Sequence, residues 1–123
     1  MAVLELQADQ LVVRLTPLEK MAAFRGDVRV PLDALRRICT DDDPWSALRG
    51  MRAPGTGIPG VVDYGVRRRT GLSPDFVAVH GRGPAIRVEL GPGAPFGRML
   101  ITVPDPATAV AAIRSGVTSR PHA

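Results

Sequence analysis

Several residue types that often indicate a function are scarce in this chain of 123 residues. Cys39 is the single cysteine, which excludes an internal disulfide and a CxxC metal or redox motif. No apolar run approaches the ~20 residues that span a bilayer. Residues 1–10 contain two acidic groups and no basic one, unlike the start of a secretory signal. These absences predict a soluble protein of the reducing cytoplasm.

Aromatic residues are also few, at 4% of the chain, and Asn is absent. Because proteins that bind single-stranded nucleic acid stack bases on aromatic side chains, we expect no nucleic-acid partner. The remaining composition, 45% hydrophobic and 23% charged, is ordinary for a globular protein. The length suits one domain. We place it at residues 1–116, followed by a flexible C-terminal tail at 117–123.

The net charge of +4 is unevenly distributed. Residues 44–98 carry eight basic and three acidic groups, whereas residues 1–43 are net acidic. A positive field of this kind attracts an acidic protein, a phosphorylated ligand or an anionic membrane. A plain solvated surface is the other interpretation.

Short segments with alternating polarity predict a mainly β fold. One hairpin is expected from residues 3–6 and 11–15, with Leu4, Leu6, Leu11, Val13 and Leu15 facing inward. A second is expected from residues 76–80 and 85–90, across Gly81-Arg82-Gly83. Further strands are predicted at 28–30, 61–67 and 99–103. Leu32, Leu35 and Cys39 also fit a helical stripe, but a turn followed by a strand at 35–40 is favoured. The Gly- and Pro-rich stretch 49–60 is predicted to be a long loop.

Three segments have helix-start signals. Thr16-Pro17-Leu18-Glu19 is a capping box that opens a short helix ending at Ala23. Asp43 and Pro44 form a weaker start before Trp45. Asp105 and Pro106 open a C-terminal helix with the apolar stripe Ala109, Val110, Ala112 and Ile113, and Gly116 is expected to end it.

Strands followed by a C-terminal helix are the layout of the pleckstrin-homology (PH) superfold. The most distinctive segments of the chain are Val30-Pro31-Leu32, Pro44-Trp45, Leu48-Arg49-Gly50, Arg52 to Gly60 and Asp75 to Val79. Through these segments, and from Leu15 to Ile113 as a whole, the chain resembles a group of small actinobacterial proteins with a PH-like domain, a group without an assigned activity. The resemblance implies a PH-like barrel or sandwich of about seven antiparallel strands, closed by a C-terminal α-helix.

Gly55-Thr56-Gly57-Ile58-Pro59-Gly60 matches the dinucleotide-binding pattern GxGxxG. That motif works when a helix follows it, because free amides at the helix N-terminus hold the pyrophosphate. Here Val61 and Val62 follow instead, and Pro59 lacks an amide donor. We expect no bound cofactor.

Two interpretations remain open for the basic residues. PH-like domains that bind inositol phosphates carry basic residues around the first hairpin, but Ala8-Asp9-Gln10 is neutral to acidic. Arg67, Arg68 and Arg69, with Arg49 and Arg52, form an alternative basic binding site. Equally, three consecutive arginines can belong to a solvated strand edge that resists aggregation.

The sequence contains few candidates for catalysis. His80 and Cys39 could serve as base and nucleophile, but nothing in the sequence brings them together. Asp41-Asp42-Asp43 lacks the spaced ligands of a calcium loop. We therefore predict that the chain is not an enzyme and holds no metal.

Trp45 is the remaining candidate. It is either an anchor for a partner or a lid packed over an open end of the barrel beneath the 49–60 loop. The sequence predicts a non-catalytic PH-like module that binds another protein or its own copies. The alternative is peripheral binding to anionic phospholipid at the inner face of the membrane. The candidate binding residues are Trp45, Arg49, Arg52, Arg67, Arg68 and Arg69.

Overall fold

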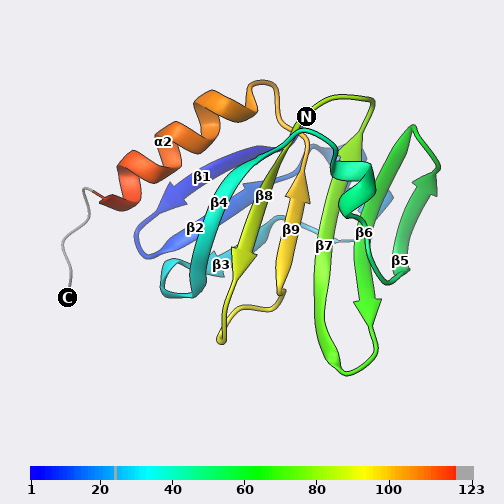
Figure 1. Ribbon diagram of the computed structural model, residues 1–123, viewed down its shortest axis with the longest axis horizontal. Coiled ribbons are helices and arrows are strands. Elements are labelled where there is room, and N and C mark those ends of the chain that lie inside the picture. The colour runs from blue at the N-terminus through cyan, green and yellow to red at the C-terminus, as the bar shows by residue number, and fades with distance from the viewer. Residues whose placement is uncertain (24, 119–123) are drawn as a thin grey trace.

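The fold is mainly β, with two sheets and a C-terminal helix (Figure 1). The computed structural model describes residues 1–23 and 25–118, with the side chains of 52–54 also left out. The strands are β1 (Val3–Gln7), β2 (Gln10–Arg14), β3 (Val28–Pro31), β4 (Leu35–Asp41), β5 (Met51–Ile58), β6 (Val62–Arg69), β7 (Leu72–His80), β8 (Ala85–Leu90) and β9 (Arg98–Ile101). The helices are α1 (Pro17–Ala23), α2 (Pro106–Thr118) and the short 3-10 turns η1 (Leu32–Ala34) and η2 (Pro44–Ala47).

The mainly β prediction is confirmed, but its finer form needs correction. Nine strands occur in the described part of the chain rather than about seven. They form a three-stranded sheet, β1-β2-β3, and a six-stranded sheet, β4-β8-β9-β7-β6-β5, and no closed barrel is detected among them. The small sheet lies behind one end of the large sheet, and α2 runs along the β4 side (Figure 1).

The main core fills the space between the two sheets and α2. Leu11 and Val13 from β2 and Phe76 from β7 have no exposed surface. The first predicted hairpin is confirmed: Leu6 pairs with Leu11, and the expected inward side chains are buried or pack against the core. Val110 and Ile113 are buried and form the apolar side of α2.

The second predicted hairpin is wrong. The turn after His80 connects β7 to β8, but β9 lies between these strands, parallel to β7 and antiparallel to β8. All four residues of β9 are buried, which is typical of a central strand covered on both faces. Alternation in β7 and β8 carries no information about a strand inserted between them.

The predicted loop at 49–60 is also wrong in part, because Met51–Ile58 is the edge strand β5. Its glycines lie opposite β6 residues, with Gly55 paired to Gly65 and Gly57 to Asp63. Backbone pairing with β6 outweighs the poor strand propensity of glycine and proline. The GxGxxG segment therefore lies in a strand and a turn, and β6 follows it where a dinucleotide site needs a helix.

The predicted caps are mostly confirmed. The Thr16 amide donates to Glu19 Oε1 at 2.9 Å, and the Glu19 amide donates to Thr16 Oγ1 at 3.2 Å. The Thr108 amide donates to Asp105 Oδ1 at 3.2 Å.

Two details of α2 differ from the prediction. Ala112 is exposed, and the helix continues through Gly116 to Thr118. A Cβ at Gly116 would lie 2.3 Å from Leu6 Cδ1, so this glycine marks close packing of α2 on β1 and not the helix end. Residues 117 and 118 of the predicted tail thus belong to α2, and its remaining residues, 119–123, lie outside the described residues.

Two turn glycines provide a matched test of the fold. Gly50 and Gly71 both have positive φ, +78° and +72°, but a Cβ at Gly50 would lie 2.5 Å from the Arg68 carbonyl oxygen, whereas Gly71 has open space. We expect G71A to lower the free energy of unfolding by about 1–2 kcal/mol. G50A should cost ~1–3 kcal/mol more from the backbone clash. Urea unfolding followed by Trp45 fluorescence measures both, and equal losses would contradict the packing at Gly50.

Candidate functional site

A segment that runs from Asp41 through η2 to Gly50 crosses the outer face of the six-stranded sheet. Trp45, Ala47 and Leu48 from this segment pack against a second, smaller core of Val77, Val79 and Leu100. The Trp45 indole Nε1 donates to the Gly81 carbonyl oxygen at 2.9 Å. Trp45 is therefore half-buried and held in one orientation.

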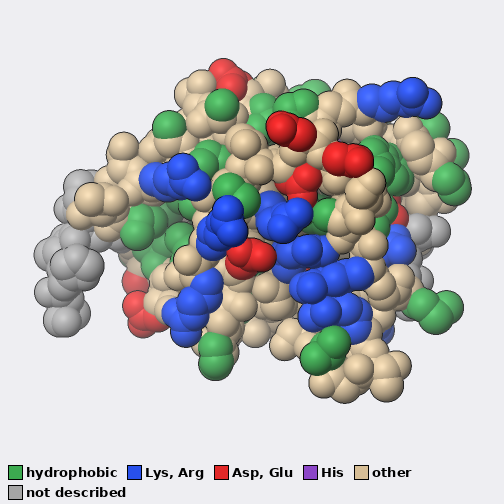
Figure 2. Space-filling model, in the orientation of Figure 1, with side chains coloured by type: hydrophobic (Ala, Val, Ile, Leu, Met, Phe, Trp, Pro, Cys, Tyr) green, Lys and Arg blue, Asp and Glu red, His purple; other side chains and the backbone are tan. Residues whose placement is uncertain are grey.

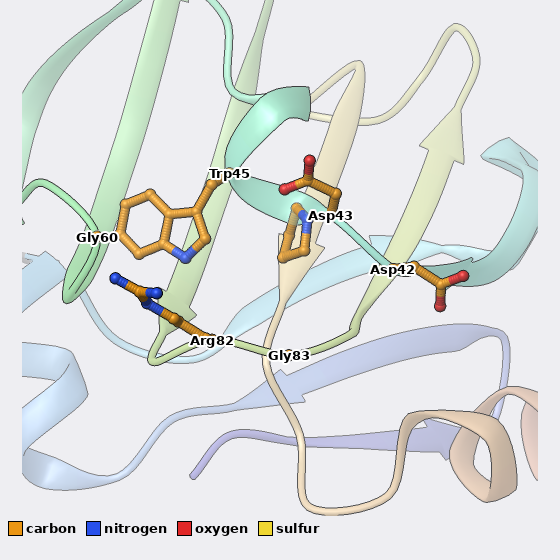
Figure 3. A pocket seen from close by; sticks show the side chains of 7 residues that line it. Asp42, Asp43, Trp45, Gly60, Arg82 and Gly83 are labelled. Atoms are coloured by element: carbon orange, nitrogen blue, oxygen red, sulfur yellow. The ribbon is translucent and has the colours of Figure 1, made fainter.

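Two hollows flank Trp45. The first, of about 370 Å³, lies between Trp45, Asp42, Asp43, Gly60 and Arg82. Figure 3 shows the Arg82 side chain on the indole side of this hollow, whereas Asp42 points away from it.

The second hollow, of about 250 Å³, lies on the Leu48 side of Trp45. Ile58, Asp63 and Arg67 also line it. Ile58 in this hollow and Val61 in the adjoining turn are 54% and 52% exposed. Trp45 thus stands between two hollows, and each of them has both charged and apolar residues in its lining.

Asp75 connects the crossing segment to the sheet. Its carboxylate is 1% exposed and accepts two hydrogen bonds from Arg49, from Nε at 2.6 Å and Nη2 at 3.0 Å. Arg98 Nε lies 3.6 Å from the same carboxylate, and Arg98 Nη2 donates to the Ala47 carbonyl oxygen. Burial, with the neighbouring Arg49 charge as the second cause, lowers the pKa of Arg98 below its ordinary value.

Arg67 holds the same segment from β6. Its Nη1 lies 2.5 Å from Asp63 Oδ2, and its Nε and Nη2 donate to the carbonyl oxygens of Arg49 and Gly50 at 3.1 Å. The guanidinium is thus committed to protein contacts. Trp45, Arg49 and Arg67 are the predicted site residues that the fold brings together.

The other predicted arginines lie elsewhere. Both Nε and Nη2 of Arg69 point to the Ser73 carbonyl oxygen across the β6–β7 turn. Arg68 is exposed and, by strand alternation, faces the opposite side from Arg67 and Arg69. The backbone of Arg52 pairs with that of Arg67, but its side chain lies outside the described part.

The solvated-edge interpretation of these arginines is wrong, because β6 lies between β5 and β7. One row across all six strands instead consists of charged residues whose sign mostly alternates. Opposite charges facing one another across strands stabilise a sheet. The row runs Arg37, Glu89, Arg98, Asp75, Arg67 and Arg52. Sequence reasoning missed Asp75 and Arg98, although a charged residue directly before an apolar run, as in Asp75-Phe76 and Arg98-Met99, was a usable signal.

The acidic run 41–43 has separate structural roles. Asp41 Oδ2 accepts from Arg87 Nε at 3.1 Å and Nη2 at 2.5 Å, while Asp41 Oδ1 accepts from the Asp43 amide at 2.9 Å. Asp43 does not cap η2 through a backbone amide as predicted, and instead accepts from the Ser46 hydroxyl at 2.6 Å. A single 3-10 turn leaves its side chain nearer the hydroxyl than the amide.

No family model, curated protein or solved structure matches this chain. Neither helix in the described residues is long and apolar enough to cross a membrane. The assignment of function therefore depends on the geometry of the site itself.

Asp75 provides the first test of this site. We expect D75N to lower the free energy of unfolding by about 3 kcal/mol, because it leaves the buried Arg98 charge without its counter-ion. E5Q, which breaks an ion pair with Arg14 in which both side chains are over 40% exposed, should change stability far less. Urea unfolding of both variants decides. Similar losses would mean that Asp75 is not the main anchor of the crossing segment.

The environment of Asp41 predicts that the folded protein loses stability in acid. Burial alone would raise the pKa of Asp41, but hydrogen bonds from Arg87 and from the Asp43 amide outweigh it, so the pKa lies below the ordinary value. A lowered pKa stabilises the fold above the unfolded value of about 4, and this stability is lost as the pH falls through the folded value. We expect unfolding free energy to fall between pH 6 and pH 3.

D41N should lose less over the same range, since it has no carboxyl to protonate at this position. Part of the acid response will remain, because two other carboxyls also have lowered pKa values. A hydrogen bond from the Leu15 amide lowers the pKa of Asp27, and a hydrogen bond from the Thr108 side chain lowers that of Asp105. Urea unfolding at pH 6, 4 and 3 measures the difference. An identical loss in both proteins would contradict a role for Asp41.

Proposed function

We propose that this chain is a non-catalytic, PH-like binding module that recognises a protein, either another chain or a second copy of itself, through the surface around Trp45. The observation that carries the proposal is a rigid tryptophan between two hollows, beside the exposed apolar residues Ile58 and Val61. Tryptophans held in this way are enriched among the residues that dominate protein interfaces.

The crossing segment supports a preformed interface. Trp45 is fixed by the sheet beneath it and by Gly81, while the amide of Gly81 donates to the Val61 carbonyl oxygen at 2.8 Å. The β5–β6 turn and the β7–β8 turn are therefore joined next to the indole. A surface that is ordered before binding loses less conformational entropy when a partner arrives.

Binding to anionic phospholipid is the second candidate. Figure 2 favours it to the extent that Lys and Arg side chains gather on the face formed by the six-stranded sheet. Arg49 and Arg67 on this face already have carboxylate partners, so they have less charge to offer a lipid phosphate. The ion pairs make the protein interface the better supported candidate.

Ile58 gives the sharpest test of the interface. Sedimentation equilibrium first measures self-association of the wild type, and capture from a lysate of the source organism, read by mass spectrometry, then tests other partners. We expect I58D to weaken the interaction at least tenfold, because a carboxylate beside the indole opposes burial of this surface. L72D is the matched control, since Leu72 is 61% exposed but lies at the opposite end of β6 and β7.

Both variants should keep wild-type stability because the side chains they replace are exposed. Unchanged binding by I58D, or equal losses in I58D and L72D, would refute the assignment of the interface to Trp45. Sedimentation with phosphatidylglycerol vesicles that falls with salt but ignores I58D would favour the lipid candidate instead.

A further inference from the structure

A second groove lies on the other face of β6, away from Trp45. It has a volume of about 330 Å³ and is formed where the start of α1 meets the ends of β6 and β7. Its lining is mostly apolar, and Tyr64 and His80 contribute aromatic rings 6.4 Å apart. The lining residues are Met1, Thr16, Leu18, Glu19, Val62, Tyr64 and His80.

Glu19 is the unusual member of this lining. It is 4% exposed, and its Oε1 is used by the capping bond from the Thr16 amide. Its other oxygen, Oε2, is buried and has no hydrogen-bond partner among the described residues. A buried carboxylate oxygen without a hydrogen-bond donor destabilises the folded protein. Because Glu19 lines the groove, a ligand in the groove is well placed to supply that donor.

The charge of Glu19 also affects the pKa of Tyr64 in the same groove. Burial is the main cause that raises the pKa of its phenol, and the negative charge of Glu19 is the second. The groove thus combines an acidic group, an aromatic ring and aliphatic walls from Leu18 and Val62. Acidic and aromatic groups together suit a cation, and the aliphatic walls suit its apolar stem.

We propose that this groove binds an organic cation with an aliphatic stem, an alkylammonium or alkylguanidinium group, whose charged end pairs with Glu19 Oε2. Because Glu19 Oε2 is buried, the lining side chains must shift before the charged end of the ligand can reach it. Leu18 and Met1 are the exposed ones, at 75% and 53%, and they can move by rotamer changes. This groove goes beyond the proposed interface at Trp45, although Val62 lines both this groove and the Leu48-side hollow.

Two basic groups belong to the lining residues and can oppose a cation, the His80 imidazole and the Met1 amino group. His80 is partly exposed at the end of β7. The binding measurements are therefore made in mildly alkaline buffer.

The probes are n-butylammonium, methylammonium and neutral 1-butanol, titrated into isotopically labelled protein and followed by NMR at Val62, Tyr64 and His80. We expect n-butylammonium to bind at least tenfold more tightly than either of the others. E19Q should remove the preference of butylammonium over butanol. The amide oxygen of that variant can still accept the capping bond from Thr16, so the start of α1 is retained.

E5Q is the matched control, because Glu5 is an exposed carboxylate on β1 whose removal should leave the preference unchanged. L18S is the second variant should E19Q fold poorly. It should weaken butylammonium binding and leave methylammonium unaffected, since only the stem loses contact. Absence of shifts at the groove, or an unchanged preference in E19Q, overturns the proposal.

Two further probes distinguish the natural source of the cation. A free diamine, cadaverine, represents a small metabolite, and an acetylated, amidated Ala-Lys-Ala peptide represents the side chain of a protein partner. Tighter binding of either one than of butylammonium supports the site and identifies its source. Binding of both no tighter than that of 1-butanol overturns the site.

Discussion

The buried carboxylate of Asp75 is the interaction on which the outer half of the molecule depends. It receives Arg49 from the crossing segment and lies beside Arg98 of β9, which in turn holds Ala47. Without that charge, Arg98 would be buried without a counter-ion, and the segment that carries Trp45 would lose its main attachment. Two kinds of contact therefore hold the candidate interface on the same face of the sheet. They are the ion pairs of Asp75 and the apolar packing of Trp45, Ala47 and Leu48.

The arginines show how structure changes the meaning of a basic sequence. Residues 67–69 suggest a charged patch that is available to a ligand. In the structure, however, Arg67 donates hydrogen bonds to a carbonyl oxygen and to Asp63, and Arg69 donates to the Ser73 carbonyl oxygen. Pairing leaves less charge for an anionic surface than the sequence implies. This is why the geometry favours recognition through a fixed aromatic side chain over recognition through charge.

The two faces of β6 offer different chemistry within a short distance along the chain. Trp45 and its hollows lie over the outer face, whereas Glu19 and Tyr64 form an acidic, aromatic groove on the inner side. Alternation of side chains along a strand makes this possible, because neighbouring residues of β6 point to opposite faces.

Local signals in the sequence determined the capping box at Thr16 and Glu19, the cap at Asp105, the first hairpin and the mainly β character, because each depends on residues close together in the chain. The sequence also indicated Trp45, Arg49 and Arg67 as candidate binding residues, but not the contacts that they make. Only the tertiary structure placed β9 between β7 and β8, turned the glycine-rich stretch into β5, and brought Asp75 and Arg98 into contact with the segment that carries Trp45. Those features depend on which strands are buried on both faces and on which charges meet across strands, and such contacts join residues far apart in sequence.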